Sequence, residues 1–128
     1  TTIGSTVTGQ YFRLANDIPT IYLYRDPVDF RKAANGLAAI VERELGHNPF
    51  NGGLYAFTNG QRNKIKCLYW EDNGFVLYYK SLAEEKFRWP RCGEEVISLS
   101  GQQINWLLDG YDIALMQGHK KLHYESVF

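Results

Sequence analysis

The residues in this chain best suited to chemistry are cations, and the densest group of them spans five positions. Arg62 lies at the tip of a polar turn, and Lys64 and Lys66 lie on the strand that leaves it. No acidic residue interrupts the run before Glu71. Alternation along a strand would place Lys64 and Lys66 on one face. Cations mixed with aromatic side chains, several of which lie nearby, can follow a nucleic-acid backbone. Lysines also protect exposed sheet edges from aggregation, so both interpretations stay open.

Two further groups of cations are candidates for the same role. Arg31 and Lys32 lie where a helix is expected to begin, and the free amides of a helix start attract phosphate. The third group surrounds Trp89, is partly offset by neighbouring glutamates, and consists of Lys86, Arg88 and Arg91. The expected nucleic-acid-binding site consists of Arg31, Lys32, Arg62, Lys64 and Lys66.

A zinc site is a weaker possibility. His119 and His123 stand four residues apart, a spacing at which two imidazoles share a helix face and can bind zinc. Cys67 and Cys92 could complete the ligand set, but neither has a second cysteine nearby. Two lysines also separate the histidines and would repel a cation. We therefore expect no metal and no other cofactor.

Three acidic pairs could support carboxylate catalysis, and each has a simpler explanation. The first pair stands where a helix start favours negative charge, and the others resemble solvent-facing turns. The chain has no Gly-x-Ser-x-Gly motif, no cysteine close to a histidine and no phosphate-binding glycine loop. We expect a non-catalytic protein, with a small nuclease or hydrolase as the weaker alternative. The pairs are Asp26 and Asp29, Glu84 and Glu85, and Glu94 and Glu95.

Composition limits the class of protein. The 128 residues suffice for one domain, and 45% hydrophobic residues exclude a disordered chain. Lys and Arg number 14, as do Asp and Glu, so the formal net charge is zero. Dedicated DNA-binding domains usually carry a basic excess, so any contact with nucleic acid must come from local patches. Two cysteines make no disulfide framework, and no apolar run approaches the roughly 20 residues that span a bilayer. With no signal-peptide pattern, we expect a cytoplasmic protein.

The elements that must position these residues begin with a β-hairpin. Two aromatic-rich runs flank Asn73-Gly74, a strong hairpin signal because both central positions of a type I′ turn need positive φ. Together with the run before them, they predict three consecutive antiparallel strands. These strands cover residues 54–58, 64–70 and 75–80.

The hairpin also predicts which side chains share a face. A two-residue loop there would pair Trp70 with Leu77 and Leu68 with Tyr79. These four side chains form the better candidate for the core face. Trp70 and Trp89 are expected to be anchors of the core.

A helix should cover that core face. Apolar residues at three- and four-residue spacing predict it over residues 27–45. Either Asp26, followed by Pro27, or Asp29 would cap its start, and Gly46 would end it.

Elements at the two ends complete the predicted fold. Strands are expected over residues 18–24 and 96–99, and Ser100 with Gln103 forms a capping box for a second helix ending near Gly110. The expected class is α+β. Its architecture is an antiparallel β-meander of three to five strands, with one main helix packed on one face and a short C-terminal helix.

Three segments are expected along the chain. The polar residues 1–17 form an N-terminal extension, residues 18–110 form a single α+β domain, and residues 111–128 form a C-terminal tail.

A series of short motifs also runs through residues 18–110. They are Asp29-x-Arg31-Lys32, Gly36-Leu37, Pro49-Phe50-x-Gly52, Phe57, Ile65-Lys66, Trp70, Gly74-Phe75, Lys80-x-Leu82 and Phe87-x-Trp89-Pro90. In this order the chain resembles the accessory protein of the insertion sequence 66 family of bacterial transposons, called TnpB or the second open reading frame. It departs from the family pattern at Ala33, where glycine is usual, and after Lys80.

The resemblance implies a process more than a mechanism. It implies a non-catalytic accessory factor for DNA transposition, acting beside the separate transposase of the same element, which supplies the chemistry. Such a factor would bind transposon DNA, the transposase, or both, and no membrane. The alternative is a pure protein-interaction scaffold without DNA contact, which the zero net charge favours.

Overall fold

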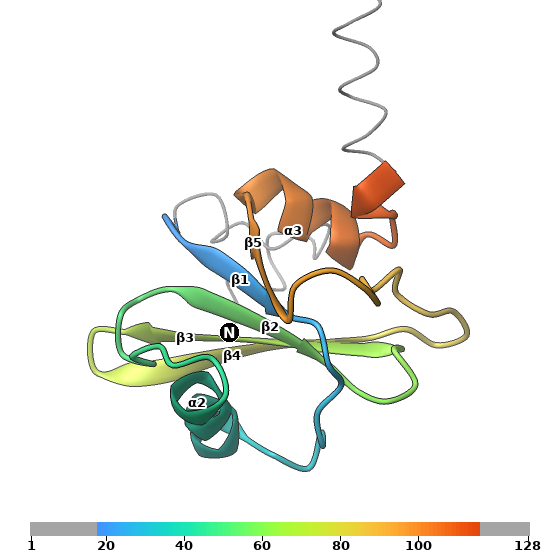
Figure 1. Ribbon diagram of the computed structural model, residues 1–128. Coiled ribbons are helices and arrows are strands. Elements are labelled where there is room, and N and C mark those ends of the chain that lie inside the picture. The colour runs from blue at the N-terminus through green and yellow to red at the C-terminus, as the bar shows by residue number, and fades with distance from the viewer. Residues whose placement is uncertain (1–17, 116–128) are drawn as a thin grey trace, which may run out of the picture.

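The fold is α+β, with helices on both faces of one five-stranded sheet (Figure 1). The computed structural model describes residues 18–115. Along the sheet the strand order is β4-β3-β2-β1-β5. β2, β3 and β4 form the expected antiparallel meander, whereas β1 runs parallel to β2. The elements are β1 Ile21–Tyr24, α2 Ala34–Arg43, β2 Leu54–Thr58, β3 Lys64–Glu71, β4 Gly74–Ser81, β5 Val96–Leu99 and α3 Gly101–Leu108.

A hydrophobic core forms on each face of the sheet, whereas the sequence favoured one face as the core. On the expected face, Leu37 and Val41 of α2 pack with Leu68 of β3. On the opposite face, Cys67 of β3 packs in a second cluster with Ile104 of α3. Every residue of β2 is buried, because this strand lies between the two clusters. The expectation of a single better core face was therefore wrong, although the main helix does cover the predicted face.

The main helix is shorter than predicted: α2 begins at Ala34, not at residue 27. The Asp29 carboxylate accepts a hydrogen bond from the backbone N–H of Arg31 at 2.9 Å, and its carbonyl accepts one from the N–H of Lys32 at 3.1 Å. These bonds close a turn that competes with a helix. Residues 27–33 therefore form a loop, which ends in the extended Ala33. The predicted stop is confirmed, since Gly46 has φ of 71° just past the helix.

The β3–β4 hairpin forms as predicted, with its turn one residue earlier. Glu71 pairs with Gly74, so the loop residues are Asp72 and Asn73, and Asp72 carries the positive φ of 55°. The pairing is thus shifted by two residues from the expected register. Because side chains alternate with a period of two, each face keeps its expected members.

Trp70 is not the deep anchor that the sequence suggested. Its side chain is half-buried near the hairpin, in edge-on contact with Phe50 and Phe75 at centroid distances of 4.9 and 5.0 Å. Trp89, by contrast, is 4% exposed and belongs to the core cluster that α3 covers.

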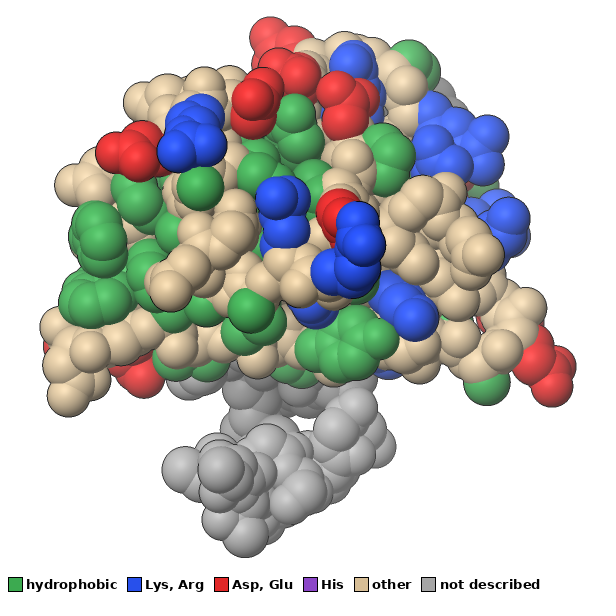
Figure 2. Space-filling view, turned by 90° about the horizontal axis from the view of Figure 1, so that it is seen from below, with side chains coloured by type: hydrophobic (Ala, Val, Ile, Leu, Met, Phe, Trp, Pro, Cys, Tyr) green, Lys and Arg blue, Asp and Glu red, His purple; other side chains and the backbone are tan. Residues whose placement is uncertain are grey.

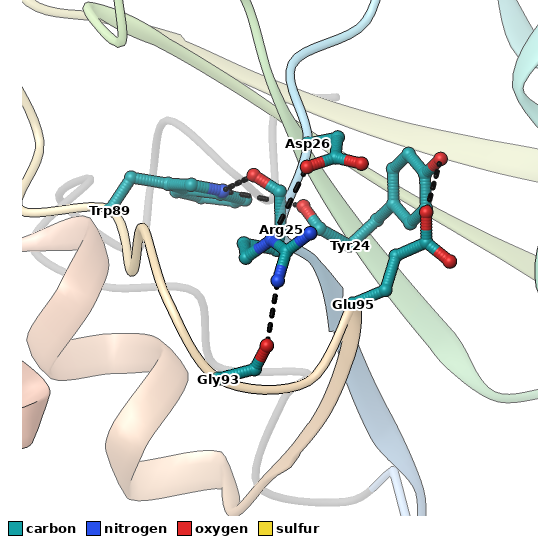
Figure 3. A network of polar contacts seen from close by, with 6 residues as sticks. All are labelled: Tyr24, Arg25, Asp26, Trp89, Gly93 and Glu95. Atoms are coloured by element: carbon teal, nitrogen blue, oxygen red, sulfur yellow. Dashed lines mark hydrogen bonds and ion pairs between the residues drawn. The ribbon is translucent and has the colours of Figure 1, made fainter.

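The segment between β4 and β5 is tied to the end of β1, as Figure 3 shows. The indole N–H of Trp89 donates to the carbonyls of Tyr24 and Arg25, at 3.3 and 3.1 Å. The Arg25 guanidinium donates to the carbonyl of Gly93 at 2.6 Å, and its backbone N–H donates to the carbonyl of Glu95 at 2.8 Å. These bonds hold an irregular segment in place, one that forms no β-strand in the described structure.

The second helix is capped at both ends. Ser100 and Gln103 form the predicted capping box, with both reciprocal hydrogen bonds present. At the other end, the ammonium of Lys80 donates to the carbonyl of Leu108 at 2.8 Å, and Gly110 takes a φ of 97°. Among residues 18–115, no helix is long and apolar enough to cross a membrane.

The difference between the two tryptophans is testable. We expect Trp89→Ala to lower the free energy of unfolding by ~3–5 kcal/mol, because it empties a buried site and removes an indole donor. Trp70→Ala should cost about 1–2 kcal/mol, since that ring is already half in solvent. Urea denaturation monitored by circular dichroism measures both. Equal losses, or a Trp89→Ala variant of near-wild-type stability, would contradict this assignment.

Candidate nucleic-acid interface

Four of the five predicted cations come together on the face that carries α2. Lys64 and Lys66 alternate along β3 on the same side as Leu68, which packs with α2. Arg31 and Lys32 lie in the loop before α2, over the same part of the sheet. Figure 2 shows Lys and Arg side chains gathered over the middle and right of this face, with acidic side chains along its upper rim. We call Arg31, Lys32, Lys64 and Lys66 the basic face.

Lys66 holds the loop before α2 against the sheet. Its ammonium donates to the backbone carbonyls of Phe30 and Lys32, both at 2.9 Å. The same nitrogen lies 4.8 Å from the ring centroid of Phe30 and 5.7 Å from that of Tyr79. Lys66 is therefore a structural link as well as a charge, and two of its three N–H donors are in use.

Arg31 carries a charge that is already paired. Its guanidinium lies 2.6 Å from the Asp29 carboxylate, and its side chain is 91% exposed. Hydrogen bonds from Arg31 lower the pKa of Asp29 from 3.8 to about 2. The pair contributes little net charge at neutral pH. Arg31 is thus the weakest of the four as a phosphate contact.

Lys32 and Lys64 are the available charges of the basic face. Lys32 is exposed and Lys64 is half-buried, and neither ammonium makes a hydrogen bond or ion pair with another described residue. Arg62, the fifth predicted cation, lies in the preceding turn with φ of 60°. Its carbonyl accepts the N–H of Phe87 at 2.8 Å, and its buried Nε has no partner in the described region. Arg62 helps to shape the turn, and no hydrogen bond or ion pair among the described residues joins its side chain to the basic face.

Tyr79 and Phe30, two aromatic residues on this face, were not predicted as part of the site. Tyr79 was expected in the core, yet it is 51% exposed. The reason is that α2 covers the middle of the sheet, and Tyr79 lies near the end of edge strand β4. Its ring lies 6.3 Å from that of Phe30. The alternation of side chains along β4 shows which face Tyr79 is on. It does not show whether a helix covers that position, which depends on where α2 begins.

The other candidates are dispersed in the structure. Asp26 pairs with Arg25, and no group of three metal-binding side chains occurs in residues 18–115. Cys67 is fully buried, which raises its pKa to about 12, and Cys92 is exposed. The two histidines of the proposed zinc pair, at positions 119 and 123, lie outside the described residues.

The third group of cations borders a shallow hollow of about 750 Å³. Lys86 and Arg88 are exposed on its wall, whereas Trp89 contributes from the core side. Glu85 and Asp112 also line it, so its charge is mixed. This group is separate from the basic face.

The link made by Lys66 predicts a local change in dynamics. Lys66→Met keeps the length of the side chain but removes both charged hydrogen bonds. We expect amide hydrogen exchange in residues 28–33 to accelerate by roughly tenfold, equivalent to losing about one such bond at a half-exposed site. Lys64→Met is the matched control on the same strand and face. Equal exchange in both variants would show that Lys66 does not hold the loop.

The pair made by Asp29 predicts a titration. Nuclear magnetic resonance should give Asp29 a pKa near 2, and Arg31→Gln should return it toward 3.8. Because the folded pKa lies below the ordinary value, the stabilisation from this pair is present above pH ~4 and is lost as the pH falls through the folded value. An unchanged pKa in Arg31→Gln would contradict the pairing.

Comparison with known proteins places the chain in a family. The family model described as "IS66 Orf2 like protein" matches residues 19–118. The protein y4jC of Sinorhizobium fredii is 32% identical over 92 residues, which cover 72% of this chain and 79% of the relative. The protein y4hO of the same organism is 28% identical over 92 residues, covering 72% and 80%. Both carry the description "Uncharacterized protein". No solved structure matches the chain significantly.

Within the described residues, the matched region contains strands β1 to β5, helices α2 and α3, and the basic face. The chain belongs to the IS66 Orf2-like family, a family of accessory proteins associated with transposition.

Proposed function

We propose that this protein is a non-catalytic accessory factor for DNA transposition, which binds transposon DNA through its basic face and works beside the separate transposase. The observation that carries the proposal is the pair of ammonium groups of Lys32 and Lys64 on one side of the sheet, neither of which has a partner among residues 18–115. Lys66 adds a third charge with one donor to spare. Arg31 and Arg62 complete the proposed site at its margins.

The geometry favours contact with the phosphate backbone over reading of bases. Helices α2 and α3 bury their apolar sides against the sheet, through Leu37 and Val41 in α2 and Ile104 and Leu107 in α3. Neither is placed as a recognition helix for the major groove. Binding should therefore be weak, sensitive to salt and largely independent of sequence.

A pure interaction scaffold is the second candidate function. Phe50 is 54% exposed and packs against Trp70 and Phe75, which gives an aromatic group at the hairpin end of the α2 face. Exposed aromatic residues are enriched in protein interfaces. With zero net charge on the chain, this group could bind the transposase without any DNA.

Salt dependence tests the proposal. With two to four phosphates neutralised, log affinity for duplex DNA should fall against log salt with a slope of roughly −2 to −4. The double variant Lys32→Glu/Lys64→Glu should flatten that slope by about two units. Lys66 stays unchanged, because its replacement would also release the loop. Fluorescence anisotropy with labelled DNA gives both values.

The matched control is Lys86→Glu/Arg88→Glu. It makes the same change in charge at exposed positions outside the basic face. If both double variants weaken binding equally, the effect is one of net charge and the placement is wrong. If the wild type binds no DNA but still retains the transposase in a pull-down, the scaffold function is correct.

A further inference from the structure

We propose that Tyr79, with Lys66 and Lys64 beside it, is a stacking site for an unpaired base of single-stranded DNA. The inference rests on the proposed function and narrows its ligand from DNA in general to strands whose bases are exposed. The proposed site uses the exposed ring of Tyr79, which belongs to neither of the two hydrophobic clusters.

The register of the sheet places the ring between charges. Tyr79 on β4 is the direct partner of Lys66 on β3, and Ser81 is the partner of Lys64. Lys64 is therefore the diagonal neighbour of Tyr79 on the same face, about 7–8 Å away between Cα atoms. A base stacked on the tyrosine would therefore have the side chains of Lys66 and Lys64 close by, where they could contact the phosphates of the same strand.

The ring is held in place while half of the residue stays open to solvent. Phe30 lies 6.3 Å away with the two planes at 56°, so the rings meet at a tilt and not face to face. The ammonium of Lys66 is 5.7 Å from the centroid of Tyr79. Half of the residue's surface is nevertheless open, at 51%. A side chain already restrained by neighbours loses less entropy when a ligand stacks on it.

The chemistry of this surface fits single strands better than a duplex. Base pairs in a duplex hide their faces in the stack, whereas a single strand offers every base to an aromatic platform. An exposed ring on a sheet, flanked by cations, is also how sheet-based modules hold unpaired nucleotides. Lys32 and Lys64 are the ammonium groups of the basic face that have no partner among the described residues. Two such groups are few for a duplex site that depends on charge alone, so stacking would supply a substantial part of the affinity.

A comparison of ligands and variants tests the inference. A fluorescein-labelled dT oligonucleotide of about 15 nucleotides and a duplex of the same length are titrated at one low salt concentration. We expect the wild type to prefer the single strand. Tyr79→Leu should weaken single-strand binding by about 5- to 150-fold, the range for losing one stacked base, and should leave duplex binding unchanged. Tyr79→Phe should bind like the wild type.

Tyr111→Leu is the matched control, because Tyr111 is 53% exposed and lies beyond α3. It should leave both affinities unchanged. Leucine at position 79 keeps an apolar contact with Phe30, and circular dichroism melting checks that each variant is folded. If Tyr79→Leu is unfolded, the comparison is made with Tyr79→Ser.

The outcomes separate this inference from the proposed function. Equal binding of single strand and duplex, with no loss in Tyr79→Leu, overturns the stacking site while the salt-dependent DNA contact stands. Equal losses in the Tyr79 and Tyr111 variants also overturn it. If the wild type binds neither ligand, both proposals fail. A single-strand preference that disappears only in the Tyr79 variants supports the site.

Discussion

The structure depends on covering both faces of one sheet. β2 is buried along its whole length, so neither of its faces can be left in water. α2 covers one side, while α3 and the segment that carries Trp89 cover the other. Once the centre of the sheet is enclosed in this way, only its ends, its edges and its loops remain to meet a partner. The basic face and the exposed aromatic residues lie at these places.

Lys66 connects the fold to the proposed site. A lysine at the margin of a covered face needs acceptors, and the backbone carbonyls of Phe30 and Lys32 supply them. The same bonds bring the loop before α2, with its cations, over the sheet. Stability and the proposed binding therefore share one side chain. Charge reversal at Lys66 would disturb both together, which is why Lys32 and Lys64 are the informative positions for binding measurements.

The distribution of charge matters more than its total. Equal numbers of acids and bases give no long-range attraction to DNA, and Asp29 neutralises one of the cations that the sequence places nearby. A protein with this distribution of charge would bind DNA weakly by itself. Its affinity would rise if it also bound a partner protein that is itself bound to the same DNA. This arrangement is consistent with the proposed accessory role beside a separate transposase.

The sequence by itself determined the local structure: the β3–β4 hairpin, the capping box at Ser100, the stop at Gly46 and the α+β class. These follow from contacts within a few residues. The family could also be recognised from the sequence, because its short motifs occur in a fixed order along the chain. The binding role of the five cations stays a prediction. Tertiary structure contributed to where α2 begins, since the loop before it is also held from far along the chain, by Lys66 through the carbonyls of Phe30 and Lys32. It also decided that both faces are core and that Tyr79 is exposed, because burial depends on which elements cover the sheet and not on the alternation within a strand.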